Sequence, residues 1–166
     1  SGVAEILQKN ATNLSDRQKQ LVQVLHVSSR SMSELVTDIL DFSRIESGEV
    51  ELDLRTTNLG HILREVYEIT SLTSQEKGIG YHLDYKAFAN VSGQYDSTRL
   101  RQVLLNLVGN AIKFTERGAV TVTPRLIEKN GQTYLSVAVT DTGIGIAENM
   151  KDKIFEQFKQ GNAFIN

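Results

Sequence analysis

The segment from Asp96 to Thr115 is the strongest constraint on how this chain can fold. Apolar residues recur in it at steps of three and four, as they do on a helix that lies against a sheet. These residues are Leu100, Val103, Leu104, Leu107, Val108, Ala111 and Ile112. A second row at the same spacing is polar and consists of Arg99, Gln102, Asn106, Asn110 and Lys113. Because Asn is a poor residue for a helix interior, this row is either a solvated face or a site where amide oxygens hold a hard cation and the ammonium holds a phosphate.

A glycine-containing segment follows a predicted strand at 134–140. Apolar residues alternate on one face of that strand: Leu135, Val137 and Val139. Asp141 continues the same parity, which predicts a carboxylate on the core-facing side at the end of the strand. A buried carboxylate needs a donor, which would be an adenine amino group or a backbone amide of the next turn. Gly143 and Gly145 let the main chain turn tightly and approach a ligand closely.

Together, the two segments resemble the N box and the first glycine box of sensor histidine kinases, which have a GHKL-type (Bergerat) ATP-binding fold. The matching sequences are Asn-Leu-Val-Gly-Asn-Ala-Ile-Lys-Phe at 106–114 and Asp-Thr-Gly-Ile-Gly-Ile at 141–146. Ile-Phe-Glu-Gln-Phe at 154–158 matches the phenylalanine box of the family. Residues 39–48 resemble the end of the dimerisation helix, especially that of hybrid kinases. The resemblance covers nearly the whole chain.

The resemblance implies a binding site for ATP with magnesium. In this site Asp141 would take the adenine amino group, Lys113 would contact a phosphate, and Asn106 and Asn110 would orient the metal and the phosphates. The implied ATP-binding residues are Asn106, Asn110, Lys113, Asp141, Gly143, Gly145, Ile146, Phe155 and Phe158, of which Asn106 and Asn110 are the implied metal ligands. The two phenylalanines would lie at the base of a lid over the nucleotide; a phenylalanine cluster is also typical of a protein core.

Residues 15–48 predict one long helix. Ser15 and Gln18 form a capping box at its start, and Gly48 is the predicted C′ residue. Along the helix, residues recur at alternating steps of four and three, which is the spacing of a heptad seam. The seam consists of Leu21, Leu25, Ser28, Met32, Leu35, Ile39 and Phe42. A seam of this length needs partners. These would be the preceding helix, whose last turns are predicted at 3–10, and a second copy in a four-helix bundle, or else the rest of the same chain.

In the family this hairpin carries the phosphoacceptor histidine, in a box that the resemblance places just before Ser1. His26 is predicted to be an ordinary helix-surface residue, and His61 and His82 lack neighbours at metal-ligand spacing. We therefore expect no catalytic residue in this sequence and no autophosphorylation of the chain alone. We interpret the chain as truncated at both ends, with the second glycine box also absent.

The pattern changes at Val50, where an alternating run predicts a half-buried strand and a domain boundary. Asn58 is the predicted N-cap of a helix that closes near Gly78, with Leu59, Ile62, Leu63, Val66 and Ile69 on its core face. Asn130 and Gly131 predict a hairpin between strands at 119–129 and 132–140, with Pro124 at an edge or a bulge.

The predicted fold is α+β. Residues 1–49 would form a long antiparallel helical hairpin for dimerisation and phosphotransfer, without the acceptor histidine. Residues 50–166 would form an α/β sandwich with a mixed sheet and helices on one face, which is the catalytic ATP-binding domain with its C-terminal part absent.

The composition narrows the possible partners. The charges nearly balance, at 18 basic and 20 acidic residues, which gives no reason to expect nucleic acid. The absence of Cys excludes disulfides and is compatible with the cytoplasm. No apolar run approaches the ~20 residues of a membrane span, although a membrane anchor elsewhere in a longer protein stays open. The expected partners are a second copy, through the hairpin, and the receiver domain of a response regulator.

The expected function is that of a protein-histidine kinase in a two-component system, which transfers the γ-phosphoryl of ATP to a histidine and then to a receiver aspartate. One alternative is a pseudokinase or scaffold with a vestigial pocket. The other is a GHKL ATPase, which uses a Glu near the first Asn to activate water. Arg99, Gln102 and Val103 occupy the turns before Asn106 without such a Glu, which argues against the ATPase.

Overall fold

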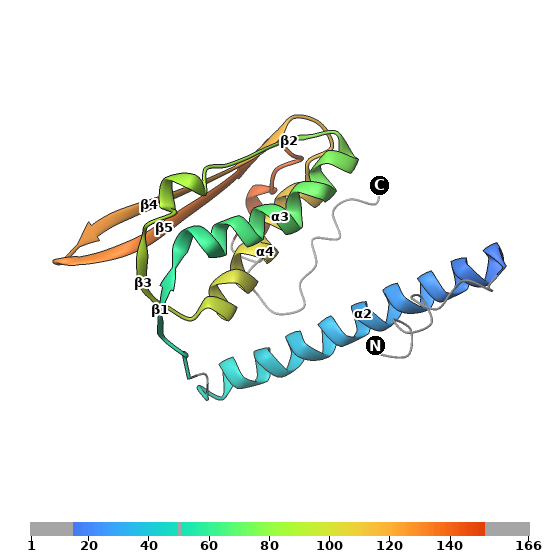
Figure 1. The fold of residues 1–166 in the computed structure, drawn as a ribbon, viewed down its shortest axis with the longest axis horizontal. Helices are drawn as coiled ribbons and strands as arrows, with labels where there is room; N and C mark the ends of the chain where they lie inside the picture. The colour runs from blue at the N-terminus through green and yellow to red at the C-terminus, as the bar shows by residue number, and fades with distance from the viewer. Residues whose placement is uncertain (1–14, 50, 152–166) are drawn as a thin grey trace. The chain divides into compact units, whose positions relative to one another are not determined.

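The computed structural model describes residues 15–49 and 51–151 (Figure 1). Contacts divide the chain into two compact units, with the division between Leu52 and Asp53. In the described part, the first unit contains α2 (Asp16–Glu46), and the second contains two α-helices and five strands. The helical turns predicted at 3–10 lie outside the described residues.

Helix α2 forms where the sequence supplies both of its ends. Ser15 Oγ accepts a hydrogen bond from the backbone N–H of Gln18 (3.4 Å), and Gln18 Oε1 accepts one from the N–H of Ser15 (2.8 Å), which completes the capping box. The helix runs for 31 residues, and Gly48 follows its C-cap with a φ of 70°. The prediction of a helix over 15–48 is confirmed.

Most of the described apolar side chains of α2 are exposed. Among the predicted seam residues, Leu21, Leu25, Met32, Leu35 and Ile39 have exposed fractions from 55% at Ile39 to 69% at Met32. Further exposed apolar residues on the same helix are Val24, Val27, Val36, Leu40 and Ile45. An exposed apolar surface of this extent indicates a binding surface.

The alternating segment that starts at Val50 is a strand only at its end. β1 (Arg55–Asn58) pairs antiparallel with β3 (Ser92–Tyr95) in a two-stranded sheet. The prediction of a half-buried strand from Val50 onward is wrong, since Leu52 and Leu54 are 59% and 55% exposed. The reason is the length of the partner: β3 ends opposite the first residue of β1, so the residues before β1 have no strand to pair with.

Helix α3 (Leu59–Lys77) has the boundaries that the sequence predicts. Asn58 Oδ1 accepts a hydrogen bond from the N–H of His61 (3.0 Å), and Gly78 ends the helix in the left-handed conformation. Its buried residues are Leu59, Gly60, Ile62, Leu63, Val66, Thr70 and Ser74. Ile69 was predicted on this face but is 57% exposed, because the buried row continues from Val66 to Thr70 one turn later.

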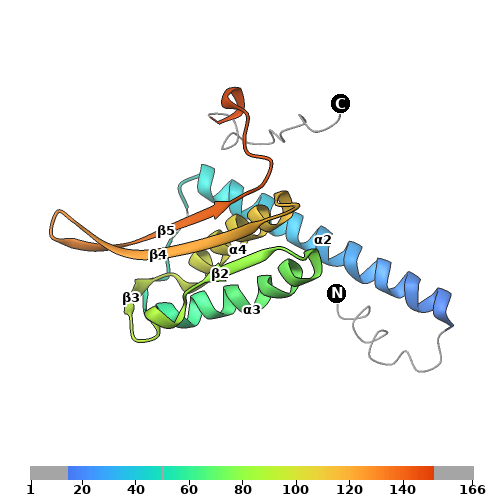
Figure 2. The same ribbon diagram turned by 90° about the horizontal axis from the view of Figure 1, so that it is seen from above.

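A three-stranded mixed sheet forms the second layer of this unit. Its strand order is β2 (Gly80–Leu83), β4 (Ala119–Lys129), β5 (Gln132–Asp141). β2 runs parallel to β4, and β4 runs antiparallel to β5. Asn130 and Gly131 turn the hairpin with φ values of 55° and 75°, as predicted. Beyond β2 and the helices, the β4–β5 hairpin extends on its own, with exposed residues at its tip (Figure 2).

Pro124 occupies the edge position that its missing N–H requires. β4 pairs with β2 only as far as Val122, so at Pro124 the strand has a partner on its β5 side alone.

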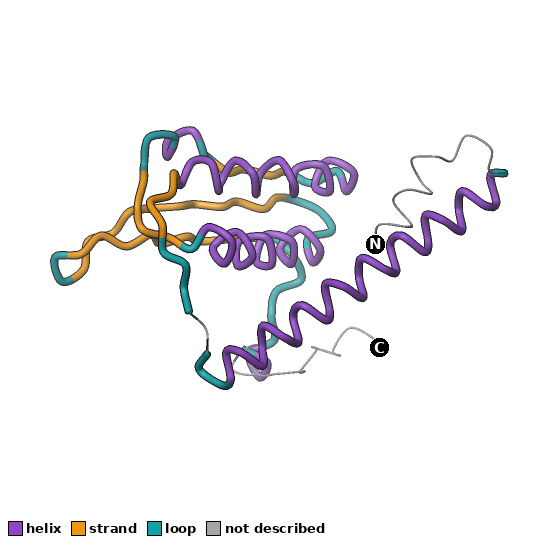
Figure 3. The backbone as a smooth tube through the Cα atoms, turned by 60° about the horizontal axis from the view of Figure 1, so that its bottom comes forward, coloured by secondary structure: helices purple, strands orange, loops and turns teal. Residues whose placement is uncertain are grey.

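The core of the second unit lies between the sheet and α3 and α4 (Ser97–Phe114), which run side by side on one face of the sheet (Figures 1 and 3). The buried apolar residues are Leu59, Ile62, Leu63, Val66, Ile79, Leu83, Leu104, Val108, Ala111, Ile112, Val120 and Val122. The predicted α+β fold, a long helix followed by an α/β sandwich with a mixed sheet, is confirmed. In the described parts of the chain, none of the helices combines the length and hydrophobicity of a membrane span.

Candidate functional site

The N-terminus of α4 is fixed by Asp96. Its Oδ1 accepts a hydrogen bond from the N–H of Arg99 (3.0 Å), as an N-cap does, and its Oδ2 accepts one from the N–H of Asp53 (3.1 Å). These bonds, chiefly the one from Arg99, stabilise the charged carboxylate and hold the pKa of Asp96 below its usual value. The cap therefore also ties the chain before β1 to the start of the helix that carries the polar row.

The polar row on α4 lies on its solvent side. Arg99 and Gln102 are half-buried, and the Arg99 guanidinium donates a hydrogen bond to Gln102 Oε1 (3.0 Å). Asn106, Asn110 and Lys113 are exposed. The helix takes this orientation because its opposite side is apolar and packs in the core. The buried residues on that side are Leu104, Val108, Ala111 and Ile112.

The apolar face of α4 is narrower than the sequence predicts. Val103 and Leu107 are 54% and 46% exposed, although both were expected in the core. They lie between the buried row and the polar row, and Phe114, also partly exposed, continues their line. The polar row is therefore bordered by apolar side chains, which is typical of pockets that combine a few polar groups with apolar walls.

Asp141 is the last residue of β5. It pairs with Val120, which is fully buried, so both side chains lie on the helix-covered face of the sheet. The carboxylate itself is exposed, and the expectation that it is buried is wrong because it lies past the edge of the core. Its Oδ1 accepts a hydrogen bond from the N–H of Gly143 (2.8 Å), so a backbone amide of the next turn is one of its donors.

The turn after Asp141 is seated on the end of α4. The N–H of Ile144 donates to the carbonyl oxygen of Phe114 (3.4 Å). A Cβ on Gly143 would overlap both this carbonyl and the Asp141 carboxylate, so only glycine fits here. The structure thus seats the turn that contains Gly143 on the C-terminal end of α4, at Phe114, one helical turn beyond Asn110.

Thr142 connects the same turn to the start of β4, a role that was not predicted from the sequence. Its Oγ1 donates to the carbonyl of Arg117 (3.1 Å) and accepts from the N–H of Ala119 (3.0 Å). Gly118 has a φ of 106°, and a Cβ there would overlap Thr142 Oγ1. A hydroxyl between Asp141 and Gly143 could have indicated this role, but its hydrogen-bond partners lie more than twenty residues away in the sequence.

The remaining predicted residues are placed only in part. Gly145 has a φ of 70°, and Ile146 is 54% exposed. Lys113 Nζ lies 5.2 Å from the centre of the Phe114 ring. Phe155 and Phe158 lie outside the described residues. The roles assigned to all these residues stay predictions.

The donor set fits magnesium only together with a nucleotide. Within residues 15–49 and 51–151, no cluster of three or more His, Asp or Glu side chains could hold a metal by itself. His61 and His82 are exposed and His26 is half-buried. Asn106 and Asn110 could supply amide oxygens, and Mg²⁺ takes most of its other ligands from phosphates and water.

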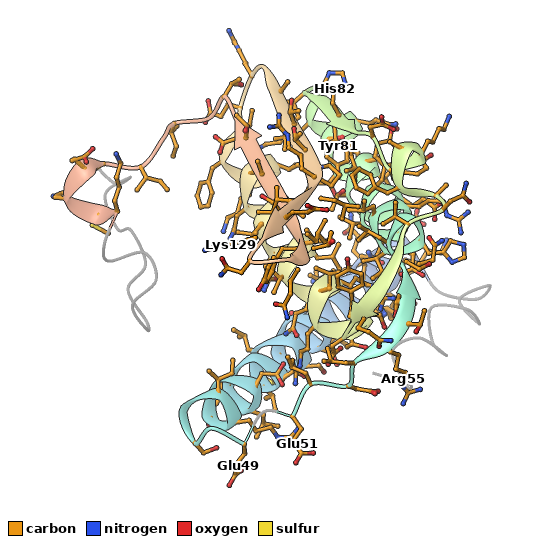
Figure 4. The ribbon with its side chains drawn as sticks, turned by 90° about the vertical axis from the view of Figure 1, so that its left-hand side faces the viewer. Glu49, Glu51, Arg55, Tyr81, His82 and Lys129 are labelled. Carbon is orange, nitrogen blue, oxygen red and sulfur yellow. The ribbon has the colours of Figure 1, made fainter. Side chains whose placement is uncertain are left out.

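Two open cavities lie away from this end of α4. One, of about 370 Å³, lies beside β2 and is lined by Tyr67, Tyr81, His82, Leu83, Asp84, Tyr85 and Lys86. Tyr81 stacks on Tyr67 at 5.2 Å between ring centres, and burial raises the pKa of its hydroxyl. The other, of about 340 Å³, shares His82 and Asp84 with the first and reaches Pro124 of β4. Figure 4 shows Tyr81 and His82 on β2. Neither cavity is lined by the amide, ammonium and glycine groups of the candidate site. We therefore locate the candidate site by these functional groups and not by a cavity.

Two family models match the chain. The model for "Histidine kinase-, DNA gyrase B-, and HSP90-like ATPase" matches residues 95–164, and the model for "His Kinase A (phospho-acceptor) domain" matches residues 1–48. Among curated proteins, the signal transduction histidine-protein kinase BarA of Escherichia coli (strain K12) is 35% identical over 161 residues, which are 93% of this chain and 17% of BarA. The chain therefore spans about a sixth of the length of that relative.

Similar solved structures are also histidine kinases. Full-length ShkA in complex with AMPPNP is 37% identical, with a TM-score of 0.72 over 96% of this chain and 33% of ShkA. The catalytic domain of ThkA is 30% identical, with a TM-score of 0.54 over 68% of this chain and 75% of that domain. ThkA in complex with the response regulator protein TrrA is 25% identical, with a TM-score of 0.58 over 96% of this chain and 45% of that ThkA chain.

Proposed function

Since the chain belongs to the sensor histidine kinase family, we propose that the C-terminal end of α4 and the turn after β5 bind ATP with magnesium. The observation that carries the proposal is the hydrogen bond from Ile144 N–H to the Phe114 carbonyl, which seats the turn after Asp141 on the helix that holds Asn110 and Lys113. The ShkA complex supports it, because that relative binds an ATP analogue.

Each group has a defined task in this proposal. The Asp141 carboxylate can accept more hydrogen bonds than the one from Gly143, and in this proposal it accepts one from the adenine amino group. The Lys113 ammonium neutralises charge on a phosphate. Asn106 and Asn110 offer amide oxygens to the cation, which when bound neutralises phosphate charge. Phosphoryl transfer demands position and charge neutralisation more than covalent chemistry, so amides, an ammonium and a carboxylate suffice for the nucleotide half.

In the whole protein, the γ-phosphoryl would pass to a histidine and then to an aspartate of a response regulator. The ThkA–TrrA complex supports a regulator as partner. We assign residues 1–49 to the dimerisation and phosphotransfer hairpin and 50–166 to the catalytic ATP-binding domain. Because the substrate is ATP, we place this part of the protein in the cytoplasm.

Titration calorimetry of the full chain with ATP, in the presence and absence of magnesium, tests the nucleotide proposal. We expect saturable binding with one ATP per chain, and tighter binding with magnesium. A folded chain that releases no heat with ATP in either condition would instead favour the scaffold alternative. Steady release of phosphate without a phosphorylated histidine would favour the ATPase.

We further propose that α2 forms a homodimer through its seam. Changing Leu25 and Leu35 together to Glu places charges on the exposed apolar surface and should convert a dimer into a monomer. The matched control changes Gln23 and Thr37 to Glu on the opposite side of the helix and should leave the dimer intact. Light scattering after gel filtration measures the mass. A wild-type monomer, or equal behaviour of both double variants, would contradict the proposal.

A further inference from the structure

Lys77, the last residue of α3, caps a helix other than its own. Its Nζ donates hydrogen bonds to the carbonyl oxygens of Ile112 (2.7 Å) and Lys113 (2.5 Å) in the last turn of α4. Both are among the last four carbonyl groups of α4, and the last four carbonyl groups of any helix have no hydrogen-bond donor within that helix. A side chain 35 residues away in sequence therefore completes the end of the helix that carries the polar row.

The other two terminal carbonyls of α4 are also occupied. The carbonyl of Ala111 accepts hydrogen bonds from the N–H of Thr115 (3.1 Å) and from its hydroxyl (2.8 Å). The carbonyl of Phe114 accepts the bond from Ile144 that seats the glycine turn. Loss of Lys77 would leave two of the four carbonyls without this partner, in the same turn that carries Lys113 and supports the glycine turn.

The charge of Lys77 matters as much as its hydrogen bonds. Because Lys77 ends α3 and contacts the end of α4, the C-termini of the two helices lie together. A helix C-terminus has a partial negative charge and disfavours anions nearby, whereas a cation there is stabilising. A phosphate bound at this end of α4 would meet an unfavourable field from both helices unless cations compensate it. The ammonium of Lys77 lies at the point where this compensation is needed.

We propose that Lys77 is a positioning residue for the phosphates of the nucleotide. It holds the last turn of α4 so that Lys113 faces the phosphates, and it offsets the negative ends of the two helices. The inference rests on the proposed nucleotide site and adds to it a residue that contacts neither the base nor the phosphates.

The test compares ATP binding to the full chain by titration calorimetry for Lys77→Met, Lys77→Arg and Lys113→Met, and for the Lys77→Met, Lys113→Met double variant. Met keeps the length and helix propensity of Lys without its donors, and Arg restores donors and charge. We expect Lys77→Met to weaken ATP binding roughly 5- to 30-fold, the effect of losing one or two such interactions, and Lys77→Arg to recover most of it. Lys129→Met, at the end of β4, is the matched control and should bind as the wild type does (Figure 4).

The double variant separates a positioning role from a general one. If Lys77 acts in part by positioning Lys113, Lys77→Met should weaken ATP binding clearly less in the Lys113→Met background, where only its effect on the helix ends remains, than in the wild type. Equal losses in both backgrounds would overturn the inference, as would wild-type affinity of Lys77→Met. A Lys77→Met chain that is unfolded by circular dichroism at 25 °C would also overturn it, because Lys77 would then serve stability alone. A wild-type chain that binds no ATP refutes the proposed function itself, which none of the other outcomes does.

Discussion

Replacing Asp141 with Ala should remove most of the ATP affinity and leave the fold intact. The carboxylate is exposed and its hydrogen bond to Gly143 is local, so its loss should change the melting temperature little. A hydrogen bond to a charged group contributes about 1.5–3 kcal/mol, which corresponds to roughly 10- to 150-fold in affinity. Titration calorimetry with ATP measures the loss. Asp141→Asn keeps an acceptor oxygen but loses the charge, so its ATP affinity should lie between those of the wild type and Asp141→Ala.

Asp84→Ala is the matched control for this variant. Asp84 is also exposed, and its Oδ1 also accepts a hydrogen bond from a nearby backbone N–H, that of Ala87 (3.2 Å). It lies before the short helical turn Lys86–Phe88 and lines the two cavities beside β2, whose lining includes no residue of α4. Asp84→Ala should bind ATP like the wild type. If Asp141→Ala binds ATP with wild-type affinity, or if both variants lose the same affinity, Asp141 does not accept a hydrogen bond from the adenine.

Asn110→Ala should strongly reduce the magnesium dependence of ATP binding. If the amide oxygen of Asn110 holds the cation, its removal should cost roughly 10- to 100-fold in affinity for Mg-ATP, at least the cost of losing a residue that only supports a metal ligand. Affinity for ATP measured with a chelator should hardly change. The measurement is the ratio of the two dissociation constants in the wild type and in the variant.

The stability of this variant gives an internal control. Asn is a poor residue inside a helix and Ala is the best, and Asn110 is exposed, so Asn110→Ala should melt at the same temperature as the wild type or higher. Asn90→Ala changes an exposed amide before β3 and should leave the magnesium ratio unchanged. An unaltered ratio in Asn110→Ala would remove this residue from the metal site.

The boundaries of the elements could be predicted because local chemistry sets them. The capping box of Ser15 and Gln18, the N-cap Asn58 and the Asn130–Gly131 turn each involve residues within a few positions of one another. The same holds for the core rows of α3 and α4, where a spacing of three and four selects the face.

The errors arose where distant parts of the chain decide the outcome. Leu52 and Leu54 alternate like a strand, but their exposure depends on where β3 ends. Val103 and Leu107 lie on the apolar side of α4, but the sheet covers only part of that side. Helical periodicity gives the direction of a side chain and not the width of the surface that it meets.

For the candidate site, the sequence predicted the residue types but not their support. Asn110, Lys113 and Asp141 were predicted from their motifs; the first two lie in the last turns of α4, and the turn after Asp141 bonds to the end of that helix. Lys77 and Thr142 were missed because their hydrogen bonds reach 35 and 25 residues along the chain. Contacts over such distances depend on the packing of α3, α4 and β4, which no local pattern contains.

The bare apolar surface of α2 has a consequence for how the chain melts. A helix that gains its burial from a second copy is stabilised by mass action, so its unfolding temperature should rise with protein concentration. The unit that begins at Asp53 buries its own core, so its transition should not move with dilution. One chain would then show two melting transitions, and only one of them would respond to how much protein is in the cell.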